Sequence, residues 1–148
     1  MNKLLCFFIL VGCSSIPLSR AEGARELWEE GKFEEAVQEY ELHIKERKKN
    51  PKRPESENPD FYQLFIGDIY LELSKPEQAK AAYQLAKEKE VRKSLIIDRF
   101  KRLARWWEDK KEFQKAINSL RPLSDLDPLT VDPEIDRLHR KMVGEEEK

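Results

Sequence analysis

The chain has few of the residues from which reactive sites are built. It contains two cysteines and two histidines among 148 residues, and His43 and His139 each stand alone, without a second ligand at metal-binding spacing. There is no glycine-rich phosphate-binding loop, and no serine, cysteine or histidine is arranged as a nucleophile with its base. The sequence therefore predicts that the protein is not an enzyme, with no catalytic residue, no metal, no cofactor and no small-molecule substrate.

Glycine is also scarce, with five residues, and no segment alternates apolar and polar residues for long enough to predict a strand. Charged residues make up 39% of the chain, while aromatic residues make up 9%. This composition is typical of amphipathic helices, and the length suits one domain or one short stack of helices. The sequence predicts an all-α protein.

Neither sign of charge is in large excess, because the formal net charge is −1. A slightly acidic chain without basic residues interleaved with aromatics is a poor candidate for binding nucleic acid. The charges are unevenly placed, however: the charged residues in 22–41 are mostly acidic and those in 92–111 are mostly basic. Most of these side chains are expected to be solvated, and the alternative is a molecule with one acidic and one basic end that orients a charged partner.

A pattern of large and small apolar residues recurs three times, at a period of about 34 residues. It is clearest in residues 97–130, where two apolar stripes with helical spacing are separated by a polar turn, and where Ala104 and Ala116 allow close approach. The positions that carry it are Phe100, Leu103, Ala104, Trp107, Phe113, Ala116, Leu120, Leu123 and Pro128. Residues 60–93 repeat the pattern, and residues 17–50 repeat it mainly in their second helix, with a first helix that starts near Arg20.

These positions resemble the large, small and terminating positions of the tetratricopeptide repeat (TPR). The resemblance implies a right-handed α-α superhelix, or solenoid, of about three helix pairs. The units are residues 17–50, 60–93 and 97–130, a capping helix covers 132–143, and the solenoid as a whole spans 23–143. Residues 144–148 are expected to fray. Such a repeat is a binding surface rather than a reaction site.

Proline and turn residues predict the boundaries of these elements. Asn58-Pro59 predicts a helix start, Ser74 with Glu77 predicts a capping box, and residues 48–58 read as an exposed loop. Pro122 predicts a bend or an early end of the helix in which it lies. Residues 132–134, Asp-Pro-Glu, predict the start of the capping helix.

The N-terminal residues predict export. Lys3 precedes a short apolar run, residues 4–11, which is far below the about 20 residues that span a bilayer. Leu10-Val11-Gly12-Cys13 resembles the bacterial lipobox, which implies that residues 1–12 are a signal peptide and that Cys13 carries the lipid, followed by a tether, residues 13–22. Several acyl chains on one residue would anchor the protein stably. Two alternatives are cleavage after Ala21, which gives a soluble exported protein, and a cytosolic chain.

The resemblance further implies that the first helices of successive units line a concave groove. Its predicted protein-binding residues are Trp28, Phe61, Phe65, Asp68, Glu72, Lys101, Arg102 and Arg105. An aromatic anchor with a charged rim is typical of peptide recognition, although Phe61 and Phe65 would also suit helix packing. The sequence thus predicts an adaptor or scaffold lipoprotein of the bacterial cell envelope that binds a protein or peptide. The alternatives are a structural subunit of an envelope assembly or export complex, and a soluble hydrolase or its accessory factor.

Overall fold

Seven α-helices and two short 3-10 helices make up residues 19–144, the part of the chain that the computed structural model describes. Their bounds are α1 Arg20–Glu29, α2 Phe33–Lys49, η1 Pro59–Tyr62, α3 Gln63–Glu72, α4 Pro76–Glu88, α5 Lys93–Asp109, α6 Phe113–Leu120, η2 Arg121–Leu123 and α7 Pro128–Met142. No strand occurs in this range, so the all-α prediction is confirmed. The predictions for the signal peptide, Cys13 and the last residues of the tail lie outside it.

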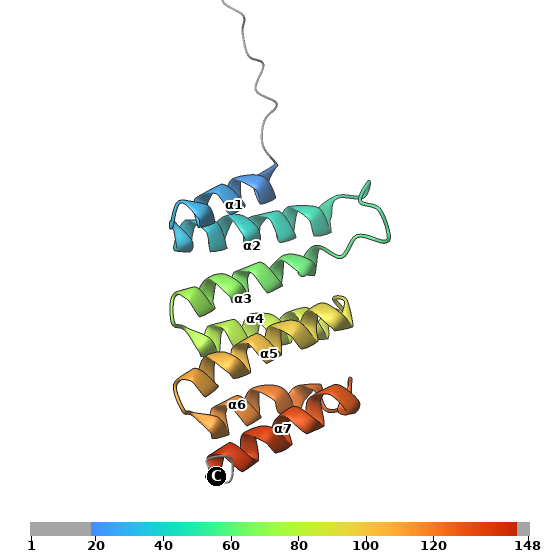
Figure 1. Cartoon of the computed structure of the whole chain (residues 1–148). Helices are drawn as coiled ribbons and strands as arrows, with labels where there is room; N and C mark the ends of the chain where they lie inside the picture. Colours follow the sequence, from blue (N-terminus) through green and yellow to red (C-terminus); the bar gives the residue numbers. More distant parts are fainter. Residues whose placement is uncertain (1–18, 145–148) are drawn as a thin grey trace, which may run out of the picture.

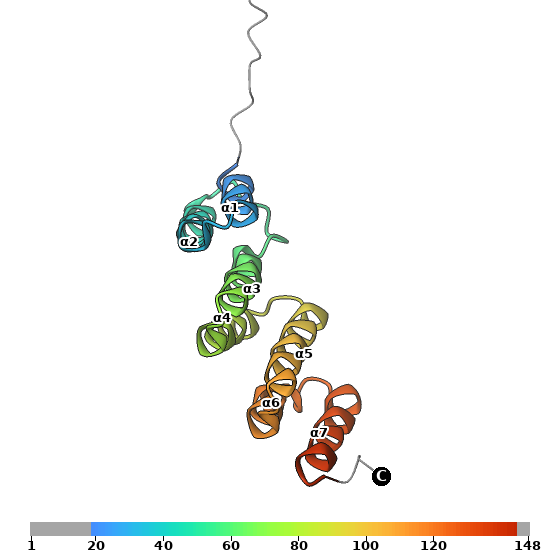
Figure 2. The same cartoon turned by 60° about the vertical axis from the view of Figure 1, so that its left-hand side comes forward.

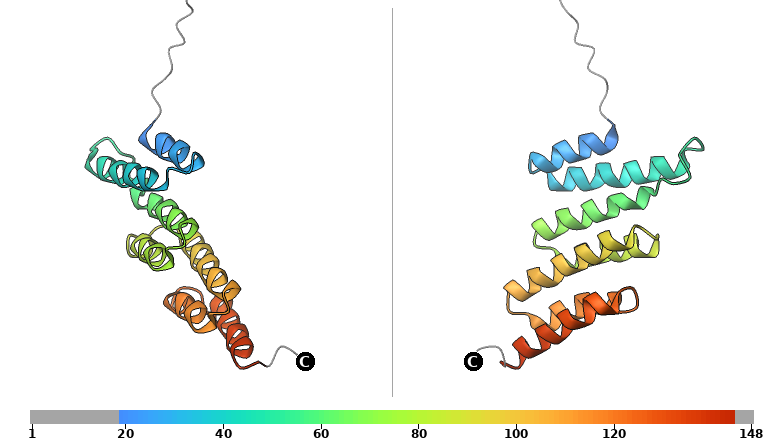
Figure 3. Two further views of the ribbon diagram at one scale, coloured as in Figure 1. Left: turned by 90° about the vertical axis from the view of Figure 1, so that its left-hand side faces the viewer. Right: turned by 45° about the vertical axis from the view of Figure 1, so that its right-hand side comes forward.

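The helices follow one another along an elongated stack, with the first helix at one end and the last at the other (Figure 1). Three pairs, α1 with α2, α3 with α4 and α5 with α6, pack as antiparallel hairpins, and α7 packs against α6. The odd-numbered helices form one layer and the even-numbered helices the other (Figure 2 and Figure 3). The surface of the odd-numbered layer therefore combines side chains from helices that are far apart in sequence.

The turn inside each hairpin has the same backbone geometry. Gly31, Ser74 and Lys111 all adopt left-handed conformations, with φ of 77°, 56° and 60°. In each turn, the residue that follows donates its N–H to a carbonyl five residues earlier, which is the Schellman arrangement that ends a helix. These bonds are Lys32 to Leu27, Lys75 to Tyr70 and Glu112 to Trp107, at 2.8, 2.8 and 3.0 Å. The three hairpins are thus equivalent in register.

Each of the three helix pairs contains small residues that are buried. Ala24 and Ala36 are buried in the first hairpin, and Ala104 and Ala116 are buried in the third. In the second hairpin Gly67 lies against the ring of Tyr83, and a β-carbon on Gly67 would come within 2.3 Å of that ring. Ala104 and Ala116, the two residues predicted to allow close approach, are both buried.

The structure places the capping box at a different helix from the one predicted. Ser74 and Glu77 do not form a capping box, because Ser74 is the left-handed residue of the turn and α4 begins at Pro76 without a side-chain cap. The capping box lies instead at Ser19, whose side chain accepts from the Glu22 N–H while the Glu22 carboxylate accepts from the Ser19 N–H. Helix α1 begins at Arg20, so the start predicted near Arg20 is confirmed, although the tether predicted over residues 13–22 overlaps the first turn of this helix.

Proline has different effects in the last two helices. Helix α6 ends at Leu120 and continues as a 3-10 turn containing Pro122, so the predicted early end is confirmed. The last helix was predicted to begin at Asp132, but α7 begins at Pro128 and keeps Pro133 inside it. Since Pro133 is exposed, its ring lies in solvent and water can satisfy the carbonyl of Leu129 that loses its partner.

Helix α7 covers the end of the core. Val131 and Leu138 are fully buried in the cluster that extends through α3 to α6, while a second cluster joins α1, α2, α3 and α4. Arg137 clamps α7 to α5, because its two terminal nitrogens each donate to the Glu108 carboxylate at 2.7 Å. Lys141 adds a third bond to Glu108 at 2.9 Å.

Candidate protein-binding groove

An aromatic pocket of about 650 Å³ opens between the first hairpin and α3. Trp28 of α1 and Phe65 of α3 lie on its two sides, with ring centroids 6.1 Å apart, and Tyr40 of α2 packs 5.6 Å from Phe65. The Trp28 indole N–H donates to the Glu72 carboxylate at 3.2 Å, which holds the indole across the gap between α1 and α3. The complete lining is Arg25, Trp28, Glu29, Gly31, Phe33, Tyr40, Phe65 and Glu72.

A second, more polar pocket of about 600 Å³ lies between α3 and α5. It is lined by Leu71, Glu72, Ser74, Arg102, Arg105, Trp106 and Asp109. Glu72 lines both pockets, so the two hollows adjoin along the surface of the odd-numbered helices. Together they offer an apolar aromatic floor at one end and two arginines at the other. We call this surface the groove.

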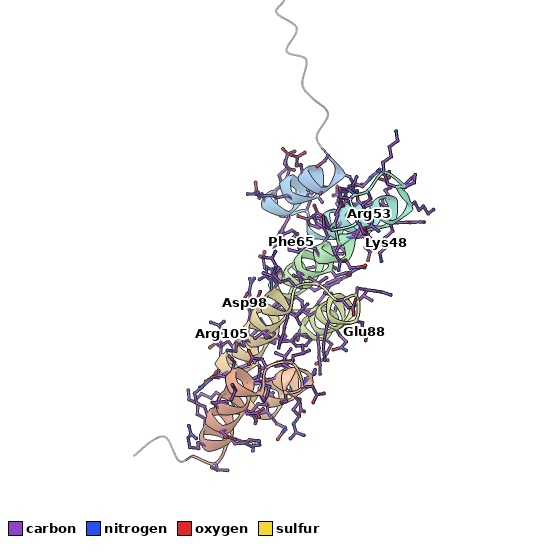
Figure 4. The ribbon with its side chains drawn as sticks, turned by 90° about the vertical axis from the view of Figure 1, so that its right-hand side faces the viewer. Lys48, Arg53, Phe65, Glu88, Asp98 and Arg105 are labelled. Carbon is purple, nitrogen blue, oxygen red and sulfur yellow. The ribbon has the colours of Figure 1, made fainter. Side chains whose placement is uncertain are left out.

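The side chains of the groove lie on one side of the molecule. Figure 4 shows Phe65, Asp98 and Arg105 along one side, and Lys48, Arg53 and Glu88 on the other. Arg105 is exposed, and its only hydrogen bond recorded among residues 19–144 goes to the backbone carbonyl of Lys101, at 3.4 Å. Within the described part of the chain Arg105 has no carboxylate partner, so it is the cation of the groove that is free to pair with an incoming anion.

Asp68 was predicted to face the groove, but the structure places it beneath the surface. Its carboxylate accepts from the Tyr83 hydroxyl at 2.7 Å and from the Arg99 guanidinium at 2.9 Å, and Arg102 lies 3.4 Å away. Burial raises the pKa of Asp68, and the bonds from Tyr83 and the arginines oppose that rise. Burial, together with the adjacent carboxylate, raises the pKa of Tyr83. Asp68 thus positions Arg102 at the groove instead of meeting a ligand.

The other predicted residues divide into two groups. Trp28, Phe65, Glu72, Arg102 and Arg105 line the groove, as described above. Phe61 is not among the lining residues of either hollow; it lines a separate pocket with Tyr62, Val91 and Leu95, and it packs edge-on against Phe65 at 5.1 Å. Lys101 also belongs to neither lining and lies near Glu134 on α7, whose pKa is lowered chiefly by the hydrogen bond from Arg137 and only to a minor extent by the charge of Lys101.

Two residues of the groove could not be identified from the sequence pattern. Phe33 and Tyr40 occupy repeat positions that are normally core, yet both line the aromatic pocket from α2. Tyr40 is almost fully buried, and burial raises its pKa to about 12, so it presents a neutral ring edge there. The helical periodicity does not distinguish a core aromatic ring whose edge reaches a pocket from one that is buried on all sides.

The described residues contain no group of three or more histidine, cysteine or carboxylate side chains placed to hold a metal ion. None of the helices between residues 19 and 144 has the length and apolar character required to cross a membrane. No model of a known protein family matches the chain, and no curated protein matches it.

Proposed function

We propose that the protein is a membrane-anchored adaptor of the TPR type, which binds a protein or peptide in the groove and carries out no chemistry of its own. The observation that carries this proposal is the pair of adjoining hollows, which join an aromatic floor to Arg102 and Arg105. Recognition of peptides commonly combines a buried aromatic or aliphatic anchor with charged contacts at the rim. Glu72 and Asp109 lie on the same surface. Together with the arginines, they would determine how a partner that carries both acidic and basic residues aligns along the groove.

The TPR-type architecture is supported by features that recur at one register. The three hairpins share left-handed turn residues, equivalent Schellman bonds and buried small residues. A right-handed solenoid of these hairpins, with α7 as its cap, accounts for the two helix layers and for a groove on the odd-numbered helices.

The lipid anchor is proposed from Leu10 to Cys13. The start of α1 favours this site over cleavage after Ala21. Cleavage after Ala21 would remove Ser19, which caps α1, and Arg20, which donates to Glu39 at 2.5 Å and to Glu46 at 3.0 Å. Cleavage before Cys13 keeps both residues and leaves a short tether. The protein would then be held at a membrane of the bacterial cell envelope.

Charge reversal in the groove tests the binding function. Full-length chain carrying Arg105→Glu should lose its principal co-purifying protein from native cells, because the free cation of the groove becomes an anion. Lys93→Glu is the matched control, since Lys93 is an exposed base on the same helix, distant from both hollows. Loss of the same protein from both variants, or from neither, would contradict the groove as the binding surface.

Mass spectrometry of the mature N-terminus tests the anchor separately. A chain that begins at Cys13 and carries acyl mass supports the lipoprotein, and Cys13→Ala should abolish both the cleavage and the added mass. A mature chain that begins at Glu22 would instead identify the soluble exported form.

A further inference from the structure

The C-terminal end of α2 and the loop after it form a basic protrusion. We name residues 45–53 the basic elbow. Three of its lysines, Lys45, Lys49 and Lys52, are exposed, and none makes an ion pair among residues 19–144. The loop projects from the stack beyond the end of α2 (Figure 1).

The acids near this surface are mostly paired already. Glu46 bonds Arg20, and Glu57 pairs with Arg47 at the base of the loop. Asp60 holds Lys48 at 2.7 Å. Glu55 and Glu41, which stands one helical turn before Lys45, make no ion pair in the described part of the chain. Residues 45–53 themselves contain six bases and one acid, so the elbow keeps a positive field.

The opposite end of the same hairpin is acidic. Glu29, Glu30, Glu34 and Glu35 surround the α1–α2 turn, and Lys32 is paired with Glu30 at 2.8 Å. Helix α2 therefore runs from an acidic start to a basic end. Near an anionic surface this separation would orient the hairpin with its elbow inward and its turn outward.

The chain enters the fold beside the elbow. Arg20 bonds Glu46 at 3.0 Å, which places the first residue of α1 next to the last turns of α2. Ser19 follows Cys13 by six positions, and six residues reach about 20 Å when fully extended. A lipid on Cys13 would thus keep the elbow within reach of the bilayer surface, where the field of anionic headgroups acts within a Debye length of about 8–10 Å.

We propose that Lys45, Lys49 and Lys52 bind the headgroups of anionic phospholipids in the membrane that holds the anchor. This inference rests on the proposed lipid anchor and fixes the orientation of the molecule. The elbow faces the bilayer, and the turns at the other end of the hairpins, with Glu72 and Asp109, point away from it. The groove then extends outward from the membrane, where a partner can reach it.

Energy transfer from a labelled loop residue tests the orientation. Full-length, lipidated chain with a donor on Ser56→Cys is reconstituted into vesicles that carry an acceptor on the lipid headgroup. Ser56 is exposed and its side chain makes no hydrogen bond within residues 19–144, and Glu77→Cys, at an exposed position in the first turn of α4, is the matched control. Transfer from position 56 should exceed transfer from position 77, should increase when phosphatidylglycerol is added to phosphatidylcholine, and should decrease in high salt.

Substitution of the three lysines tests the contact itself. K45Q/K49Q/K52Q should abolish the response to phosphatidylglycerol, while K32Q/K75Q/K111Q, at the turns, should keep it. Each lysine removed should lower affinity for anionic vesicles about five-fold. Equal transfer from positions 56 and 77, or an unchanged response in the elbow variant, would overturn the inference. Circular dichroism melting confirms that both triple variants remain folded.

Flotation with phosphatidylcholine vesicles separates this inference from the anchor. If the protein carries no lipid, it will not float with phosphatidylcholine vesicles. This outcome would reject the proposed lipid anchor but would leave the proposed headgroup contact to be tested. That chain is then added to phosphatidylglycerol vesicles. Binding that the elbow variant loses would uphold the lipid contact, and absence of binding would overturn it.

Discussion

Gly67 lies where α3 and α4 meet, and the ring of Tyr83 leaves no room there for a β-carbon. Gly67→Ala should lower the free energy of unfolding by about 1–3 kcal/mol, because the two helices must move apart. Gly23 is the matched control, since its β-carbon would meet no atom within 4 Å. Gly23→Ala should raise stability by up to about 1 kcal/mol through helix propensity alone. Urea denaturation measures both, and a Gly67→Ala chain as stable as the parent would contradict the packing.

The carboxylate of Asp68 links α3 to α4 and α5. Asp68→Ala should cost about 2–4 kcal/mol, because it leaves the Tyr83 hydroxyl and the half-buried Arg99 without their partner. Asp98 bonds the same arginine at 2.8 Å but is 59% exposed. Asp98→Ala should therefore cost less than about 1 kcal/mol. Similar losses in the two variants, measured by urea denaturation, would show that the buried position of Asp68 has no special role.

At the scale of elements, α7 is held to α5 by Glu108. Hydrogen bonds from Arg137, and then from Lys141, lower the pKa of Glu108 to about 2 from an ordinary value of 4.5. Because the folded pKa lies below the unfolded one, this contribution to stability is complete above about pH 5 and is lost as the pH falls toward 2.

Glu108→Gln should thus be destabilised by about 1–3 kcal/mol at neutral pH, and the difference from the parent should shrink between pH 5 and pH 2. Urea denaturation across this range measures it. Glu112→Gln is the control, since Glu112 is an exposed residue at the start of α6 and pairs with Lys115 of that helix at 3.4 Å. A difference that stays constant with pH would exclude the charged form of Glu108 as its source.

The positions of the helices were predicted well from the sequence. A helix that buries one face must carry apolar residues at helical spacing, as Phe100, Leu103 and Trp107 do. The ends of the helices were predicted less well. Ser74 has the chemistry of a helix cap but occupies a turn position that requires a left-handed backbone. Pro133 has the chemistry of a helix start but lies inside α7, where solvent replaces the lost bond. Both errors arise because local preference was outweighed by the geometry of the whole hairpin or helix.

At the scale of the whole molecule, the positions of the groove residues depend on how the hairpins stack. Trp28, Phe65, Glu72, Arg102 and Arg105 could be predicted because repeat register decides which face of a first helix is outward. The burial of Asp68 could not be predicted, because it depends on contacts with Tyr83 and with Arg99 from a later helix.

The end of the stack gives a prediction about the core. Leu138 on α7 is fully buried, while Leu129 on the same helix is 90% exposed. Leu138→Ala should lower the free energy of unfolding by about 2–5 kcal/mol, because it opens a cavity beneath the last helix. Leu129→Ala should change it by less than about 0.5 kcal/mol. Thermal denaturation compares them, and equal effects would mean that α7 does not close the core.

The groove is the central claim, and site-specific photocrosslinking in native cells tests it most directly. A photoreactive residue at Phe65 on the aromatic floor should give one dominant protein adduct. The same residue at Gln78, an exposed position on α4 in the other helix layer, should not. Arg105→Glu should reduce the adduct from position 65. A folded chain that yields no adduct from position 65, or equal adducts from both positions, would contradict the account.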